Sequence, residues 1–187
     1  DPQAPMIPRV GLRMQLPDSF TRLEYYGRGP WENYIDRRTS CFIGRYEANI
    51  ADLYELYVRP QENSHRTDVS WFALTGKKNA LLIVADSLLE FNVSNYPLES
   101  FDSGDHRDDG RQRPENPQQR HNCDPKPAEL VDLFIDYRMM GLGGDDSWGA
   151  QPHEEYQINL APGKISYGFS LIPLDKNANF EKAIKQY

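Results

Sequence analysis

Apolar side chains recur at every second position in several short stretches of this chain, and turn-forming residues separate those stretches. The alternation runs through residues 10–16 and 131–137, while residues 69–75 and 80–85 flank a Gly-Lys-Lys-Asn turn at residues 76–79. A repeat of two is typical of a strand with one buried face, and the short turn is typical of a hairpin. Many short strands joined by Gly, Pro and Asn turns predict an all-β fold, an antiparallel β-sandwich.

Further strand signals and two short helical signals complete the pattern. Residues 89–93 alternate in the same way. Residues 155–160 and 165–172 flank an Ala-Pro-Gly-Lys turn, and they predict a second hairpin. Only residues 97–101 and 179–185 favour helix. The helical content is therefore expected to be small.

Length and charge limit the class of protein. The 187 residues fit a single β-sandwich domain, residues 1–187, long enough to bury a sizeable core. The net charge of -7 argues against binding to nucleic acid or to an anionic membrane, because both need a basic surface. No apolar run approaches the roughly 20 residues that span a bilayer. The chain begins at Asp1 without an initiator Met or a signal peptide, so we expect a piece of a longer polypeptide.

Cysteine and histidine give no metal-binding spacing. Cys41 and Cys123 lie far apart, and two free thiols are expected, with one long-range disulfide as the alternative. The four histidines are scattered, three of them in polar surroundings, and all are expected at the surface: His65, His106, His121 and His153. No metal or cofactor is therefore assigned to this chain.

Residues 102–127 interrupt the strand pattern. Cys123 is their only apolar side chain, among eleven charged residues and four prolines. Such a segment cannot bury enough apolar surface to order itself. We expect a long polar, mobile surface loop within the domain, and a functional loop is the alternative.

The most distinctive segment follows the apolar alternation of residues 131–137. Residues 141–149 contain four glycines, together with Asp145, Asp146, Ser147 and Trp148. Glycine permits tight turns that other residues resist. A lone tryptophan on such a loop is expected to fold back over the sandwich edge, and the alternative is an indole that faces a ligand.

Three motifs carry a resemblance to a known family. They are the stretch Tyr-Gly-Arg-Gly-Pro-Trp-Glu-Asn-Tyr-Ile-Asp-Arg at residues 26–37, Tyr-Val-Arg-Pro-Gln-Glu-Asn at 57–63, and Gly-Leu-Gly-Gly-Asp-Asp-Ser-Trp at 141–148. From about Pro8 to Pro173 the chain resembles the C-terminal domain, or separate small chain, of glycoside hydrolase family two β-galactosidases. The resemblance implies a large antiparallel supersandwich related to galactose mutarotase.

The resemblance also implies a role beside other domains. In the family this domain packs on a (β/α)8 barrel that carries the catalytic carboxylates and the Mg and Na sites. The tryptophan of the glycine-rich loop, here Trp148, forms a platform for the galactoside substrate. The parent enzyme is expected to be a homo-oligomer. Two departures are Trp31, where a polar residue is common, and the longer, more charged stretch at residues 102–127.

The other motif residues have two interpretations. Asp145 and Asp146, with Ser147, are expected to build the loop by accepting backbone N–H bonds, and direct sugar contact is the alternative. The first motif supplies four polar side chains for a network at the barrel interface: Glu32, Asn33, Asp36 and Arg37. A local turn held by Asn33, with a surface Asp36–Arg37 pair, is equally compatible. The same choice applies to three residues of the second motif: Arg59, Glu62 and Asn63.

No catalytic residue is assigned. A retaining glycosidase needs two carboxyl groups about 5–5.5 Å apart, and neighbours such as Glu154 and Glu155 point to opposite sides of an extended chain. The Glu32/Asp36 pair would lie on an exposed turn, and the chain is shorter than the roughly 250 residues of a barrel.

The expected function is a non-catalytic domain that completes a β-galactosidase active site. A free-standing carbohydrate-binding module is the alternative. A mutarotase-like enzyme is disfavoured, because it needs a histidine acid and a carboxylate base that converge in a cleft.

Overall fold

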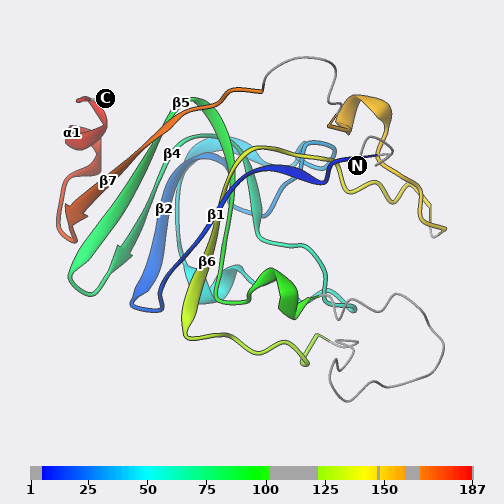
Figure 1. Ribbon diagram of the computed structural model, residues 1–187, viewed down its shortest axis with the longest axis horizontal. Coiled ribbons are helices and arrows are strands. Elements are labelled where there is room, and N and C mark those ends of the chain that lie inside the picture. Colours follow the sequence, from blue (N-terminus) through cyan, green and yellow to red (C-terminus); the bar gives the residue numbers. More distant parts are fainter. Residues whose placement is uncertain (1–5, 102–121, 147, 159–164, 187) are drawn as a thin grey trace.

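A computed structural model describes residues 6–101, 122–146, 148–158 and 165–186. Within these ranges seven strands form one antiparallel sheet with the order β1-β6-β5-β4-β2-β3, and β7 also pairs with β5. The bounds are β1 Arg9–Pro17, β2 Phe20–Gly29, β3 Phe42–Asn49, β4 His65–Gly76, β5 Asn79–Ser94, β6 Leu130–Met139 and β7 Phe169–Asp175. The predicted all-β antiparallel class is confirmed (Figure 1).

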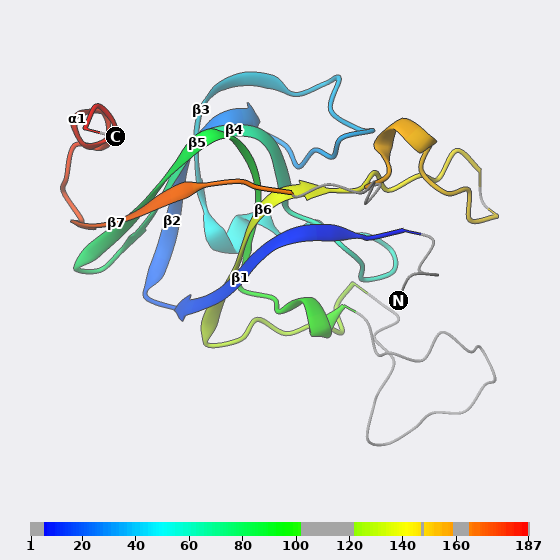
Figure 2. The ribbon, with the colours of Figure 1, turned by 45° about the horizontal axis from the view of Figure 1, so that its top comes forward.

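Strand β5 divides the sheet into two arms. Its first half, Asn79 to Ala85, pairs with β7, and its second half, Glu90 to Ser94, pairs with β6. Along its other edge β5 pairs with β4. The sheet therefore curls, and β1 and β6 cross in front of the other strands in Figures 1 and 2.

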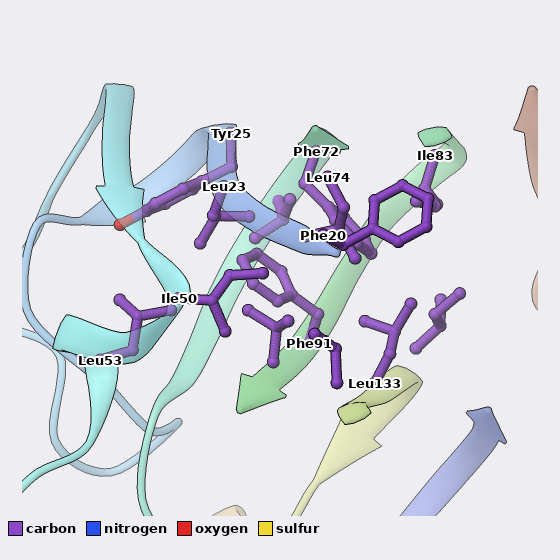
Figure 3. Close-up of a cluster of buried hydrophobic side chains, with 14 of the residues drawn as sticks. Phe20, Leu23, Tyr25, Ile50, Leu53, Phe72, Leu74, Ile83, Phe91 and Leu133 are labelled. Atoms are coloured by element: carbon purple, nitrogen blue, oxygen red, sulfur yellow. The ribbon is translucent and has the colours of Figure 1, made fainter. Parts of the chain in front are cut away.

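The main core lies inside this curl. Its buried side chains come from β2, β4, β5 and β6, and from the 3-10 helix η1, Ile50–Leu53. Phe72 and Phe91 stack with ring centroids 4.4 Å apart. Figure 3 shows both rings among Leu23, Leu133 and the η1 side chains. Burial of these apolar faces is what the period-two alternation predicts.

A second apolar cluster covers the opposite face of β4 and β5. It contains Trp71, Leu82, Ile172 and Phe180, contributed by β4, β5, β7 and the C-terminal helix α1, Phe180–Ile184. Strand β4 is therefore buried on both faces.

Most of the predicted elements are confirmed. The hairpin forms with Thr75 opposite Ala80, and residues 89–93 belong to the same long strand, β5. The two helical signals correspond to η2, Leu98–Ser100, and to α1. None of the helices within the described residues is long and apolar enough to cross a membrane.

The second predicted hairpin is wrong. Its first half contains the 3-10 helix η3, Glu154–Tyr156, while β7 pairs with β5 instead. The Tyr156 carbonyl accepts from Gly141, outside the sheet, and the Tyr156 N–H donates to His153. These local bonds replace a strand ladder, so the alternation of Tyr156 and Ile158 does not produce a strand. The Ala-Pro-Gly-Lys turn predicted between the two halves lies within residues 159–164, outside the described ranges.

Candidate functional site

The tryptophan loop, residues 141–150, leaves the end of β6 in a glycine-dependent conformation. Gly143, Gly144 and Gly149 have φ angles of 69°, 89° and 87°, which disfavour any L side chain. A Cβ on Gly143 would also collide with the carbonyl oxygen of Ala150. The Gly144 N–H donates to that carbonyl at 3.0 Å, so the loop closes on itself with Trp148 inside the closed segment.

Two aspartates bind protein groups around the loop tip. Asp146 Oδ1 accepts from the backbone N–H groups of Trp148 at 2.7 Å and Ala150 at 3.2 Å. Asp145 Oδ2 lies 2.5 Å from His153 Nε2, and this hydrogen bond raises the pKa of the exposed His153 imidazole. Asp146 therefore accepts the backbone N–H bonds expected of a residue that builds the loop, whereas the bond of Asp145 is to the His153 side chain.

The Trp148 side chain extends into solvent. It is 92% exposed. An indole this exposed does not fold back over the edge of the sheet. The adjacent Ser147 lies outside the described residues. The loop presents a flat apolar ring with one N–H donor, a shape that suits the apolar C–H face of a pyranose.

Asp36 joins the first motif to the tryptophan loop. Its Oδ2 accepts from the Gly143 N–H at 2.9 Å, although the two residues are 107 positions apart. A Cβ on Gly141 would lie 2.6 Å from the same oxygen, so the carboxylate packs directly on the loop backbone. The other oxygen, Oδ1, is buried without a hydrogen-bond partner among the described residues.

Asn33 fastens the first motif to β4. Its side chain is fully buried, and its amide donates to the carbonyls of Arg28 and Trp31 at 3.1 Å each. Its Oδ1 accepts from the Thr67 N–H at 3.1 Å and from the Thr67 hydroxyl at 2.6 Å. The amide thus satisfies buried groups on both sides of the junction.

Glu32 connects the first motif to the segment around the second. Its Oε1 accepts from Arg37 and from the Tyr57 hydroxyl, and its Oε2 accepts from the Ser64 N–H at 2.7 Å. Burial, and then the hydrogen bond to Glu32, raise the pKa of Tyr57. Arg37 therefore pairs with Glu32, not with Asp36 as in the surface pair considered above.

A hollow of about 380 Å³ lies where these segments meet. Its walls come from the Tyr34–Arg37 turn, from the tryptophan loop and from η3: Asp36, Arg37, Leu142, Gly143, Asp145, His153, Glu155 and Tyr156. Carboxylates, a guanidinium and an imidazole thus surround one open space. Such a lining provides hydrogen-bond donors and acceptors for a polar ligand or a neighbouring surface.

Comparison with known families identifies the chain. The family described as the β-galactosidase small chain matches residues 1–171. The chain belongs to the β-galactosidase small-chain family. All three motifs, including the first motif with Asp36 and the tryptophan loop, fall inside the matched region.

The chain is similar to curated β-galactosidases of several bacteria. The chain is 31% identical to a β-galactosidase of Priestia megaterium over 91% of its own length. It is 32% identical to one of Vibrio cholerae over 83%, and 31% identical to one of Leuconostoc mesenteroides over 94%. It spans only 15%, 14% and 15% of these three relatives.

This small-chain family member also contains a buried polar cluster that the sequence analysis did not predict. The cluster lies on the face of β5 and β6 opposite the main core, and it comprises Arg9, Glu62, His65, Glu90, Asn92 and Asp136. His65 Nδ1 lies 2.6 Å from Asn92 Oδ1, and its Nε2 lies 3.0 Å from Glu90 Oε2. The Arg9 guanidinium binds Asp136 Oδ2 at 2.8 Å. The cluster therefore joins four strands and the second motif.

Burial dominates the electrostatics of this cluster. Desolvation raises the pKa of Asp136 to about 6, and the nearby Arg9 only partly offsets it. Burial lowers the pKa of the His65 imidazole, but the hydrogen bond to Glu90 and the negative charges of Glu90 and Asp136 together outweigh it, and the net shift is upward. Asp136 Oδ1 is buried without a partner among the described residues.

The expectation that the histidines lie at the surface is wrong for His65. Its ring is fully buried and stacks on Tyr34, with centroids 5.3 Å apart. Its sequence neighbours are polar, yet they are buried too, because the segments of the first and second motifs cover them. An imidazole and a carboxylate do converge here, but the His65 ring has no exposed surface among the described residues. His153 is exposed, as expected, and His106 and His121 lie outside the described residues.

The signal for the cluster was polar residues inside apolar strands. Glu90 and Asn92 alternate with core residues of β5, and Asp136 follows Ile135 in β6. Sequence reasoning assigned such positions to a solvated face. In the second motif Asn63 is buried and its carbonyl accepts from Asn92 at 2.6 Å, whereas Arg59 is exposed.

Cys41 and Cys123 are both free, and Cys41 is buried. This confirms the expected pair of thiols. Within the described ranges, no group of three or more His, Cys, Asp or Glu side chains is placed to hold a metal ion. Of the polar segment at residues 102–127, only residues 122–127 lie in the described part.

Proposed function

We propose that this chain is the small-chain part of a β-galactosidase that hydrolyses terminal β-galactosides. In this proposal Trp148 forms a stacking platform for the sugar beside a (β/α)8 barrel. That barrel supplies the catalytic carboxylates and the metal ions. The observation that carries the proposal is the 92% exposed indole on a closed, anchored loop of a small-chain family member.

The indole is large enough to matter for binding. If stacking removes roughly 60–100 Å² of apolar surface from water, it contributes about 1.5–2.5 kcal/mol. That corresponds to about one to two decades in affinity. The hollow beside the tryptophan loop adds polar groups that suit sugar hydroxyls. Loss of the indole should therefore weaken substrate and acceptor binding more than it slows bond cleavage.

The hydrogen-bond partners of the acidic side chains support a catalytic pair outside this chain. Glu32 is held by Arg37, Tyr57 and a backbone N–H. Asp145 binds His153, and Asp146 binds the loop backbone. A retaining mechanism needs one carboxylate free to attack and one carboxylic acid poised to donate its proton. These side chains act as loop and turn supports instead.

Complementation tests the proposal. The chain is combined with the remainder of a β-galactosidase, and hydrolysis of a chromogenic galactoside is measured. Wild type and Trp148→Ala should both assemble, and the alanine variant should need about 10- to 100-fold more glucose-type acceptor to trap the galactosyl group. Trp31→Ala, which removes another exposed indole, is the matched control. Unchanged acceptor affinity in Trp148→Ala would refute the platform role.

A free-standing carbohydrate-binding module is the second candidate. The exposed indole beside an open polar hollow favours it, because both belong to this chain alone. Titration of the isolated chain with galactosides, followed by tryptophan fluorescence, separates the two functions. Saturation at millimolar sugar that is lost in Trp148→Ala supports the module. No response in the isolated chain, with restored hydrolysis on complementation, supports the small-chain function.

A further inference from the structure

The loop that carries Trp148 has an anchor on a distant part of the chain. The Gly143 N–H, at the base of the tryptophan loop, donates to Asp36 Oδ2 at 2.9 Å. This base is also where the backbone adopts the positive φ of Gly143. A shift of the base would move everything beyond it, including the indole.

The support under Asp36 is rigid. Tyr34 and Arg37 exchange two backbone hydrogen bonds of 3.2 and 2.8 Å, which close a tight turn around Asp36. Tyr34 is fully buried and stacks on the His65 ring. Asn33, immediately before the turn, is buried and bound to Thr67 on β4. The carboxylate is therefore held by the sheet itself and not by another exposed loop.

The other hydrogen bonds of the loop among the described residues lie within the loop, at the surface or on η3. The Gly144 N–H binds the Ala150 carbonyl, and Asp146 accepts from the backbone N–H groups of Trp148 and Ala150. These bonds join parts of the same loop, so they move with it. The His153–Asp145 pair is solvent-exposed on both sides, and exposed pairs contribute little. Gly141 is bonded to Tyr156 of η3, which lies outside the sheet. Asp36 thus ties the loop base to the buried framework.

We propose that Asp36 is a positioning residue that fixes the tryptophan loop, and with it the Trp148 indole, in the orientation used for sugar stacking. The orientation matters because a flat ring covers a pyranose only when the two faces are parallel and in contact. Loss of the anchor lets the ring sample other orientations, so the sugar must select one of them and its apparent affinity falls. The consequence for sugar binding rests on the proposed function, whereas the anchoring itself does not.

The first test measures the mobility of the indole in this chain without any sugar. The indole N–H signal of Trp148 is identified by its disappearance in Trp148→Phe, and its heteronuclear NOE reports motion on the picosecond to nanosecond timescale. Asp36→Ala should lower the NOE at Trp148 and leave the Trp71 indole unchanged. Asp36→Asn keeps an acceptor oxygen and should restore most of the wild-type value.

Asp175→Ala is the matched control. Asp175 Oδ1 also accepts a backbone N–H at 2.9 Å, from Asn177, but at the end of β7, which lies at the opposite end of the molecule (Figure 1). If Asp36→Ala does not fold, Asp36→Ser replaces it, because the serine hydroxyl is too short to reach Gly143. An unchanged Trp148 NOE in the folded Asp36 variant overturns the inference.

The second test uses the complemented enzyme. Asp36→Ala should raise the acceptor concentration needed for half-saturation by about 3- to 10-fold, with a smaller change in kcat. In a Trp148→Ala background the same substitution should have no further effect on acceptor affinity, because the ring it orients is absent. Full additivity of the two substitutions overturns the inference.

The two tests separate this inference from the proposed function. A mobile indole in Asp36→Ala, with unchanged acceptor affinity in Trp148→Ala, keeps the anchor and refutes the sugar platform. Weak acceptor binding in Trp148→Ala, with a fixed indole in Asp36→Ala, keeps the platform and refutes the anchor.

Discussion

The buried polar cluster and the tryptophan loop lie at the same end of the sheet, but they use polar groups in opposite ways. In the cluster, His65 and Asp136 are fully buried, and their partners come from several strands. In the loop, Asp146 binds its own neighbours and leaves Trp148 in solvent. The two are connected, since the Met139 N–H, just before the loop, donates to Glu90 Oε2 at 2.6 Å.

The difference separates two roles for motif residues. Asn33 and Asn63 are buried and hold segments together, whereas the Trp148 side chain extends into solvent. A residue of the first kind should affect stability, and a residue of the second kind should affect binding. Asp36 stands between them, because a buried framework supports it while its carboxylate meets the loop.

The largest effect is expected from removing the cation of the cluster. Arg9→Met leaves the buried Asp136 carboxylate without its charged partner, and we expect the free energy of unfolding to fall by about 3 kcal/mol at pH 7. Urea denaturation measures it. Arg22→Met breaks an exposed pair with Glu47 and should change stability by less than about 0.5 kcal/mol. Equal effects of the two substitutions would show that the cluster is not a stability element.

The titration of Asp136 should appear in the pH dependence of stability. Its pKa is raised from 3.8 to about 6 in the folded chain, so the folded state binds the proton more tightly than the unfolded state. Its stabilising contribution is fully present below about pH 4 and is lost as the pH rises through about 6. The loss amounts to at most about 3 kcal/mol.

The measurement compares wild type with Asp136→Asn by denaturation between pH 4 and pH 8. The asparagine cannot titrate, and the substitution also removes a charge that helps to raise the pKa of His65. The stability of wild type relative to the variant should therefore fall between pH 4 and 6 and level off above pH 7. A difference independent of pH would contradict the raised pKa.

Loss of the Asn33 side chain, which fastens the first motif to β4, should destabilise the chain less than loss of Arg9. Asn33→Ala leaves the Thr67 hydroxyl and the Arg28 carbonyl without their partner, at a cost of about 2 kcal/mol. Asn49→Ala, which removes an exposed side-chain bond to Asp52, is the control and should cost less than about 0.5 kcal/mol. If Asn33→Ala matches this control, the first motif is not fastened through its amide.

Local patterns and long-range pairing differ in how far the sequence predicts them. The alternations in β1 and β6 predicted strands correctly, because a side-chain period of two records one buried face. The alternation at Tyr156 did not produce a strand, since its backbone groups bond to His153 and Gly141 instead. His65 was misplaced because its cross-strand partner, Asn92, depends on register and not on neighbouring residues.

The candidate site shows the same limit. The glycines around Trp148 predicted a tight loop from local sequence alone. The contact between Asp36 and Gly143 spans 107 positions, and no spacing rule connects two such residues. Only the fold brings the end of β2 beside the end of β6.

The smallest effect on overall stability is expected inside the loop itself. Gly143→Ala puts a side chain at a φ of 69° and against the Ala150 carbonyl, a strain of about 1–2 kcal/mol. Because the loop lies outside the main core, the strain should open the loop and not unfold the sheet. We expect the free energy of global unfolding to change by less than about 0.5 kcal/mol, while amide hydrogen exchange at Gly144 accelerates about 10-fold.

Gly144→Ala is the control, because its Cβ would meet nothing within 4 Å and it carries backbone strain without the collision. The exchange rate of the Trp148 amide should therefore rise less in Gly144→Ala than in Gly143→Ala. A large loss of global stability in both variants would mean that the loop folds as part of the core, and the contrast between a closed cluster and an open loop would no longer hold.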